Sequence, residues 1–115
     1  MGVEFSVGWE SVEEFQAAES EGGAPYAHMT SSNFRRVMEN GFGLDRSMVG
    51  VEWPQGFVDP GVLLARKDDA RAWASEQPVE WVAGGDWMSV FELRVEDVLS
   101  VCSLAERLGR PVVWA

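Results

Sequence analysis

A chain of 115 residues has the size of one domain and can enclose one hydrophobic core. Its 19 Asp and Glu against 9 Lys and Arg give a formal net charge of −10. This imbalance argues against direct binding to nucleic acid, whose phosphates need clustered cations, and it disfavours anionic membrane surfaces. No apolar run approaches the roughly 20 residues that span a bilayer. We therefore expect a soluble single domain over residues 1–115.

The first 25 residues are predicted to form an acidic segment made of a strand and a helix. Val3, Phe5 and Val7 alternate with polar residues, which favours a half-buried strand. The run SVEE at residues 11–14 has the form of a capping box and predicts a helix from there to about Ala18. The glycines and the proline that follow predict a loop.

A second strand and a second helix are expected after this loop. Residues 26–30 favour a short strand. Ser31 or Ser32 is then placed to cap a helix over residues 33–39, because a hydroxyl oxygen accepts an otherwise free N–H group of the first turn. Residues 40–41, Asn-Gly, are a natural stop for this helix.

The middle of the chain combines an irregular connection with a third helix. Glycines and a proline are scattered over residues 42–58, where Trp53 and Phe57 are expected to anchor the connection onto the core. Asp59 and Pro60 are a strong helix start, since the carboxylate accepts N–H groups and proline suits the first position. The pattern predicts one helix from there to about Glu76.

The helix predicted over residues 90–108 is the most strongly marked element. The run SVFE at residues 89–92 is a second capping box, and Gly109 with Pro111 provides the stop. Apolar residues cover more than half of its circumference, so this helix is expected to be flanked on several sides. Residues 112–114 are β-prone and are expected to pair with an early strand. The predicted fold class is α+β, with three or four helices packed on a small sheet and this long C-terminal helix at the centre.

The sequence contains few of the residue types and motifs that catalytic and metal sites use. The single histidine excludes sites built from histidine pairs, including His-rich zinc sites. The single cysteine, Cys102, falls on the apolar side of the long helix and is expected to be a buried, inert thiol. The glycine-rich phosphate-binding motifs do not occur. We therefore assign no catalytic, cofactor-binding or metal-binding residue and favour a protein that is not an enzyme.

An alternative comes from the sequence HMT at residues 28–30, followed by the predicted helix and Phe42. This stretch resembles the first strand and helix of ADP-ribosyltransferase folds. The resemblance implies a second strand at residues 61–64, an NAD cofactor held by His28 and Thr30, and either ADP-ribosyl transfer or simple nucleotide binding. The simpler interpretation is a partly buried, hydrogen-bonded structural His28.

A second resemblance covers about three quarters of the chain. Residues 30–37, 58–66 and 105–115 are similar to small uncharacterised proteins of actinobacteria and their phages. The resemblance implies a shared fold and a bacterial or phage origin. It assigns no functional residue.

The acidic charge is concentrated at one end of the chain. Residues 1–34 hold six glutamates and no Lys or Arg. One interpretation is a solvated face that keeps the protein soluble, and the other is an acidic surface that binds a basic partner protein. The candidate partner-binding residues are Trp9, Glu10, Glu13 and Glu14, the tryptophan because aromatic residues are frequent at the centres of interfaces.

These observations favour a non-enzymatic, cytoplasmic protein-interaction module of bacterial or phage origin. One form of such a module is an inhibitor that acts through an acidic surface. The cytoplasm is expected because the chain starts without a signal-peptide pattern and has one cysteine. The alternatives are the NAD-binding or ADP-ribosyltransferase-like protein described above, and a structural homo-oligomer subunit that buries its tryptophans.

Overall fold

Four antiparallel strands form the main sheet, in the order β2-β1-β6-β3. The computed structural model describes residues 2–44, 56–82 and 86–115, with side chains outside residues 79–88. The sheet strands are β1 (Gly2–Val7), β2 (Tyr26–Thr30), β3 (Gly56–Val58) and β6 (Val112–Trp114). A second, smaller sheet pairs β4 (Val79–Val82) with β5 (Asp86–Ser89). The expected pairing of the last strand with an early one is confirmed, because β6 lies beside β1.

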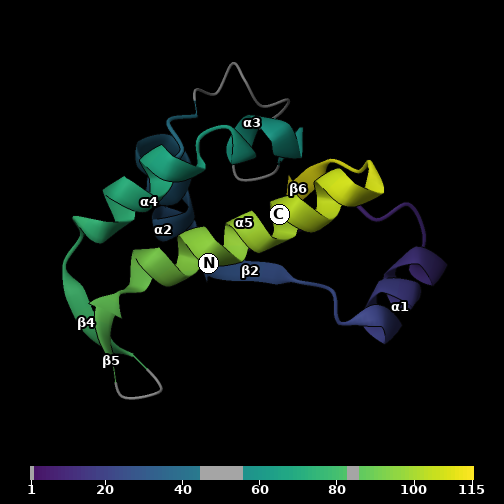
Figure 1. Cartoon of the computed structure of the whole chain (residues 1–115), viewed down its shortest axis with the longest axis horizontal. Coiled ribbons are helices and arrows are strands. Elements are labelled where there is room, and N and C mark those ends of the chain that lie inside the picture. The colour runs from purple at the N-terminus through teal and green to yellow at the C-terminus, as the bar shows by residue number, and fades with distance from the viewer. Residues whose placement is uncertain (1, 45–55, 83–85) are drawn as a thin grey trace.

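Five α-helices accompany the sheet and confirm the α+β class (Figure 1). They are α1 (Val12–Glu21), α2 (Ser31–Arg36), α3 (Pro60–Leu64), α4 (Lys67–Ser75) and α5 (Val90–Leu108), with a π-helical turn η1 (Val37–Gly41) directly after α2. None of the described helices is long and apolar enough to cross a membrane.

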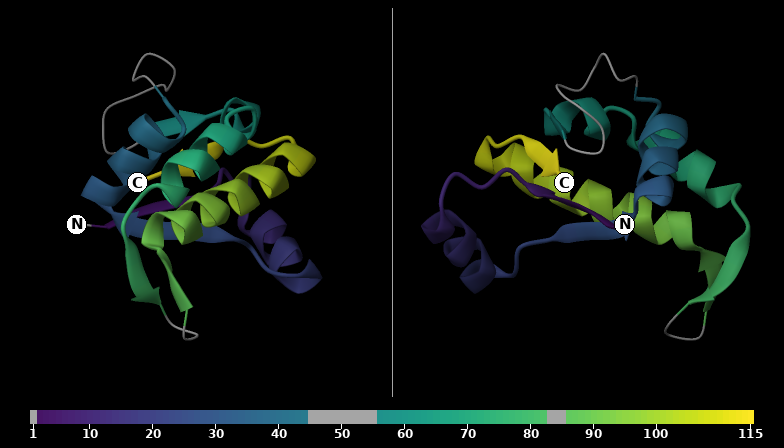
Figure 2. Two further views of the ribbon diagram at one scale, coloured as in Figure 1. Left: turned by 60° about the vertical axis from the view of Figure 1, so that its left-hand side comes forward. Right: turned by 180° about the vertical axis from the view of Figure 1, so that it is seen from behind.

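Helix α5 is the centre of the fold, as its wide apolar arc predicts (Figures 1 and 2). It packs against β1 and β2 of the sheet and against α3 and α4. Seven of its residues are buried: Phe91, Val95, Val98, Leu99, Val101, Cys102 and Ala105. Its ends follow the predicted signals, with Ser89 accepting a hydrogen bond from Phe91 N at 3.1 Å and Gly109 in the left-handed conformation. Burial raises the pKa of the Cys102 thiol to about 12, as expected for an inert core cysteine.

Three aromatic rings fill the core between the sheet and α2. The ring centroid of Phe34 lies 6.1 Å from that of Phe5 and 5.5 Å from that of Trp114. Gly56 lets the indole lie directly on β3, because a Cβ atom at that position would stand 2.4 Å from Trp114 Cζ2. All three rings are almost completely buried, so this cluster ties α2 to the two central strands.

The helix predicted from Pro60 to Glu76 is broken in two, which raises the helix count to five. Arg66 leaves the helical conformation, with φ −113° and ψ 13°, and its N–H bonds to Leu63 O at 2.9 Å. The break has a tertiary cause. α3 packs on α5, whereas α4 packs on both α5 and η1, so the chain must change direction between them.

Two smaller predictions are also wrong. The cap of α2 is Thr30, whose Oγ1 accepts from Asn33 N at 3.2 Å, so neither Ser31 nor Ser32 has that role. Phe57 does not anchor the core, because it points to the other face of the sheet and is 50% exposed. The alternation of β3 places Val58 inward instead. Trp53, the other expected anchor, lies outside the described residues.

Candidate functional site

Helix α1 stands beside the core without contributing to it. None of its residues is buried. The predicted cap is confirmed, since Ser11 Oγ accepts from Glu14 N at 3.2 Å, but the helix runs three residues past the expected end at Ala18. Its apolar contact with the body is Phe15, whose ring meets that of Trp9 edge-on at 5.7 Å between centroids. The helix is therefore held mainly by polar contacts.

Arg110, from the far end of the chain, provides those contacts. Its Nε donates to Glu14 Oε1 at 3.0 Å and its Nη2 to Glu14 Oε2 at 2.6 Å, and Nη2 also bonds to Glu10. The hydrogen bonds from Arg110 hold the pKa of Glu14 below its ordinary value. The hydrogen bond with Glu14 in turn raises the pKa of Arg110. Two of the four candidate partner-binding residues thus hold α1 against the end of α5.

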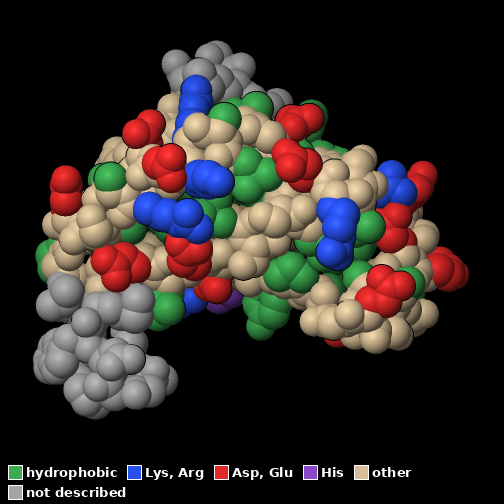
Figure 3. All heavy atoms as spheres, in the orientation of Figure 1, with side chains coloured by type: hydrophobic (Ala, Val, Ile, Leu, Met, Phe, Trp, Pro, Cys, Tyr) green, Lys and Arg blue, Asp and Glu red, His purple; other side chains and the backbone are tan. Residues whose placement is uncertain are grey.

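The other two candidates lie in different surroundings. Trp9 is partly buried between Phe15 and the core. Glu13 is exposed and, among the described residues, has no hydrogen bond or ion pair. In Figure 3, acidic side chains gather over and around α1 with cationic side chains beside them. No spacing in the sequence points to Arg110, which lies 96 residues from Glu14.

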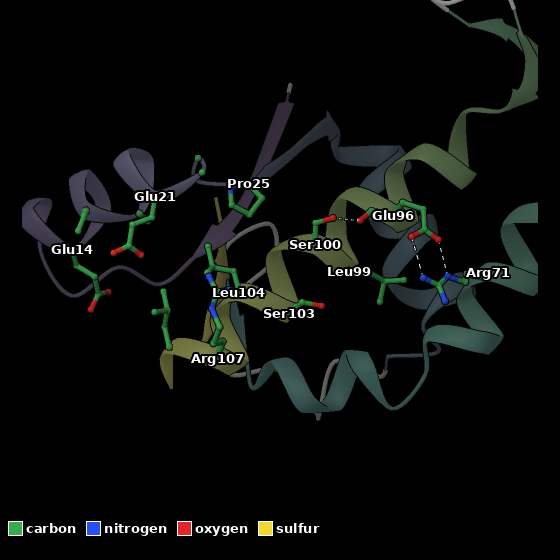
Figure 4. Close-up of a pocket in the computed structure, with 15 residues that line it drawn as sticks. Glu14, Glu21, Pro25, Arg71, Glu96, Leu99, Ser100, Ser103, Leu104 and Arg107 are labelled. Atoms are coloured by element: carbon green, nitrogen blue, oxygen red, sulfur yellow. Dashed lines mark hydrogen bonds and ion pairs between the residues drawn. The ribbon is translucent and has the colours of Figure 1, made fainter.

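A groove with a volume of about 720 Å³ separates α1 from α5 (Figure 4). Leu99, Leu104 and Leu108 of α5 give it an apolar wall, and the small side chains of Ala17 and Ala18 face them from α1. Leu108 is 38% exposed although it belongs to the apolar arc of α5. The arc is therefore wider than the core needs, and its excess lines this groove.

The polar groups of the groove divide into paired and unpaired ones. At one end Arg71 binds Glu96 through two hydrogen bonds, of 2.6 and 3.1 Å (Figure 4). Glu21 on the α1 wall and Arg107 on the α5 wall are exposed, and neither has a partner within the described part of the chain. The two walls thus offer free charges of opposite sign. Sequence reasoning singled out neither of these residues, because each reads there as ordinary surface.

His28 and Thr30, the residues of the NAD alternative, lie on the edge strand β2. The hydroxyl of Thr30 is used as the cap of α2. His28 is exposed, in register with Glu4, and its ring lies over Gly2, so the simpler interpretation of a partly buried histidine is wrong. Residues 61–64, where the resemblance implies a strand, belong to α3.

We expect calorimetry with millimolar NAD to give no binding heat with the wild-type protein and none with His28→Ala. The reason is that the Thr30 hydroxyl already serves the backbone and His28 faces solvent. A heat that is present in the wild type and lost in His28→Ala would contradict this expectation and favour the nucleotide-binding alternative.

In the described ranges no group of three or more His, Cys, Asp and Glu residues could hold a metal ion. Comparison of the chain with protein-family models, with curated proteins and with solved structures finds no match. The resemblances to ADP-ribosyltransferases and to actinobacterial and phage proteins stay predictions.

Proposed function

We propose that the protein is a non-enzymatic interaction module that binds an extended segment of a partner protein in the groove between α1 and α5. The observation that carries this proposal is the apolar wall of the groove. Leu104 and Leu108 are incompletely buried, whereas most of the other apolar residues of α5 fill the core. A partner segment would remove this surface from water, which favours binding in proportion to the area covered.

The length of the groove fits an extended segment. It follows α5 from Glu96 to Leu108, a rise of about 18 Å. An extended segment spans this length with about five residues, at about 3.3 Å each.

The free charges of the two walls indicate which segment fits. Side chains of an extended chain point alternately to opposite sides. In the partner segment, a Lys or Arg would face Glu21, and an Asp or Glu at the neighbouring position would face Arg107. An apolar residue of the segment would lie against Leu104. The exposed glutamates of the N-terminal segment, such as Glu13, add a field that attracts a partner with a basic surface. An inhibitor of such a partner in a bacterial or phage-infected cytoplasm is one form of this function.

A phage-displayed library of random heptapeptides, selected on the immobilised protein, tests the proposal. We expect enriched peptides that combine an apolar residue with a neighbouring cationic residue. Their binding, followed by fluorescence anisotropy, should weaken at least tenfold in Leu108→Glu, because a carboxylate replaces apolar contact area. It should also weaken as the salt concentration rises from roughly 0.05 to 0.5 M.

Leu93→Glu is the matched control. Leu93 lies on the same helix and is 38% exposed, the same value as Leu108, but it does not line the groove. We expect this variant to bind the selected peptides as the wild type does. Equal losses in both variants, or a library without enriched sequences, would refute peptide binding in the groove.

A further inference from the structure

The face of the main sheet that points away from α5 carries an exposed aromatic row. One residue of each strand belongs to this row, because the four are partners in the strand register and share one face of the sheet. They are Tyr26 of β2, Ser6 of β1, Val113 of β6 and Phe57 of β3. Tyr26 is 62% exposed and Phe57 is 50% exposed, the two largest values among the aromatic residues whose side chains are described. No described helix covers this face, as the view from behind in Figure 2 shows.

The charge of this face differs from that of the protein as a whole. The outward positions of β1 and β2 hold a single acidic residue, Glu4, and the one histidine, His28. The outward positions of β3 and β6 are Phe57 and Val113, which are uncharged. A chain with a net charge of −10 repels a second copy of itself at most orientations. Contact through this face brings only one carboxylate per copy, that of Glu4, into the interface.

We propose that a second copy of the chain docks on this sheet face, forming a twofold dimer in which the two sheets pack face to face. A twofold axis parallel to the strands, between β1 and β6, lays β2 of one copy over β3 of the other. Tyr26 then packs against Phe57 of the second copy, and symmetry repeats the contact on the other side. Two aromatic rings fill the spacing of about 10 Å between packed sheets.

The size of the face sets the strength of this dimer. Four strands about 4.8 Å apart make the patch about 15 Å wide. β1 and β2 have 6 and 5 residues but β3 and β6 have 3 each, so the patch is about 20 Å long at β1 and about 10 Å long at β3 and β6. Two such patches cover on the order of 500 Å² of sheet, less than the roughly 1,000 Å² of a stable specific interface. The dimer is therefore weak and forms in the micromolar to millimolar range of protein concentration. It leaves the groove between α1 and α5 free, because that groove lies on the other side of the sheet.

Sedimentation equilibrium of the full chain between about 1 μM and 1 mM tests this proposal. The wild type should change from monomer to dimer over this range. Tyr26→Ser and Phe57→Ser should each raise the dimer dissociation constant at least tenfold, because each removes both copies of the aromatic contact. The double variant should be little worse than either single variant, since all three lose the same pair.

Val12→Ser is the control, because Val12 is the most exposed large apolar residue of those the structure describes, at 66%, but lies on α1, away from the sheet face. It should dimerise as the wild type does. A wild type that stays monomeric to 1 mM would overturn the proposal. So would a dimer that Val12→Ser weakens as much as Tyr26→Ser does, or one in which the two sheet substitutions add independently. Far-ultraviolet circular dichroism confirms that each variant is folded.

Discussion

Replacing Phe34 by alanine is expected to lower the free energy of unfolding by about 3–5 kcal/mol. Phe34 is completely buried and its ring packs on those of Phe5 and Trp114. The substitution removes this apolar contact area and leaves a cavity that the surrounding strands and α5 cannot close without moving. A domain of this size is stable by only about 5–15 kcal/mol, so the loss removes a large share of its stability.

Urea denaturation followed by tryptophan fluorescence measures this effect, and the melting temperature should fall by roughly 10 °C or more. Phe57→Ala is the control, because it makes the same chemical change at a side chain that is 50% exposed. At about 1 μM protein, the lower end of the sedimentation range, we expect it to cost less than about 1 kcal/mol. Similar losses in the two variants would show that the aromatic cluster is not the core that we describe.

Replacing Arg110 by glutamine is expected to release α1 while the rest of the fold stays intact. Arg110 binds both Glu14 and Glu10, and α1 buries none of its own residues. Without the guanidinium, little holds the helix beyond the contact between Phe15 and Trp9. Amide hydrogen exchange should show at least a tenfold loss of protection over residues 12–21, with protection in α5 unchanged.

The matched control for this prediction is Arg107→Gln. Arg107 precedes Arg110 by three residues and has no ion pair among the described residues, so α1 should keep its protection. If both variants lose protection over α1, or neither does, Arg110 is not what holds the helix. Peptides selected for the groove should also bind Arg110→Gln more weakly, because one wall of the groove is no longer fixed.

The contact between Arg110 and Glu14 also determines how the stability of α1 changes with pH. Arg110 holds the pKa of Glu14 below its ordinary value of 4.5, so the folded state favours the ionised carboxylate. The stabilisation is fully present above pH 4.5 and is lost as the pH falls through the lowered pKa, when Glu14 takes up a proton. Protection factors over α1 should therefore fall in acid for the wild type and stay low at every pH for Arg110→Gln.

Local signals were sufficient for several elements. The alternation of Val3, Phe5 and Val7 with polar residues predicts β1. Ser89 and Gly109 predict the two ends of α5. These predictions hold because the signals act over a few neighbouring residues and agree with the burial that the fold requires. The α+β class follows from them directly.

Predictions failed where a distant part of the chain decided the outcome. The pattern of residues 60–76 fits one helix, but packing of α4 on η1 requires a turn at Arg66. The three-residue strand β3 exists because β6 pairs with it, and the smaller sheet of β4 and β5 has no counterpart among the elements that the sequence predicts. Short strands carry little sequence signal of their own, and pairing with a partner stabilises them.

The candidate site shows the same division between sequence and tertiary structure. The sequence by itself determined the central helix, the buried cysteine, and an N-terminal third that holds six glutamates and no cation. It also showed that α5 has more apolar surface than one side of a helix needs. Only the tertiary structure brought Arg110 to Glu14, which uses part of the acidic segment to hold α1, and placed the excess apolar surface in a groove. The physical reason is range: caps and periodicity act within a few residues, whereas ion pairs, grooves and open sheet faces arise from segments that folding brings together.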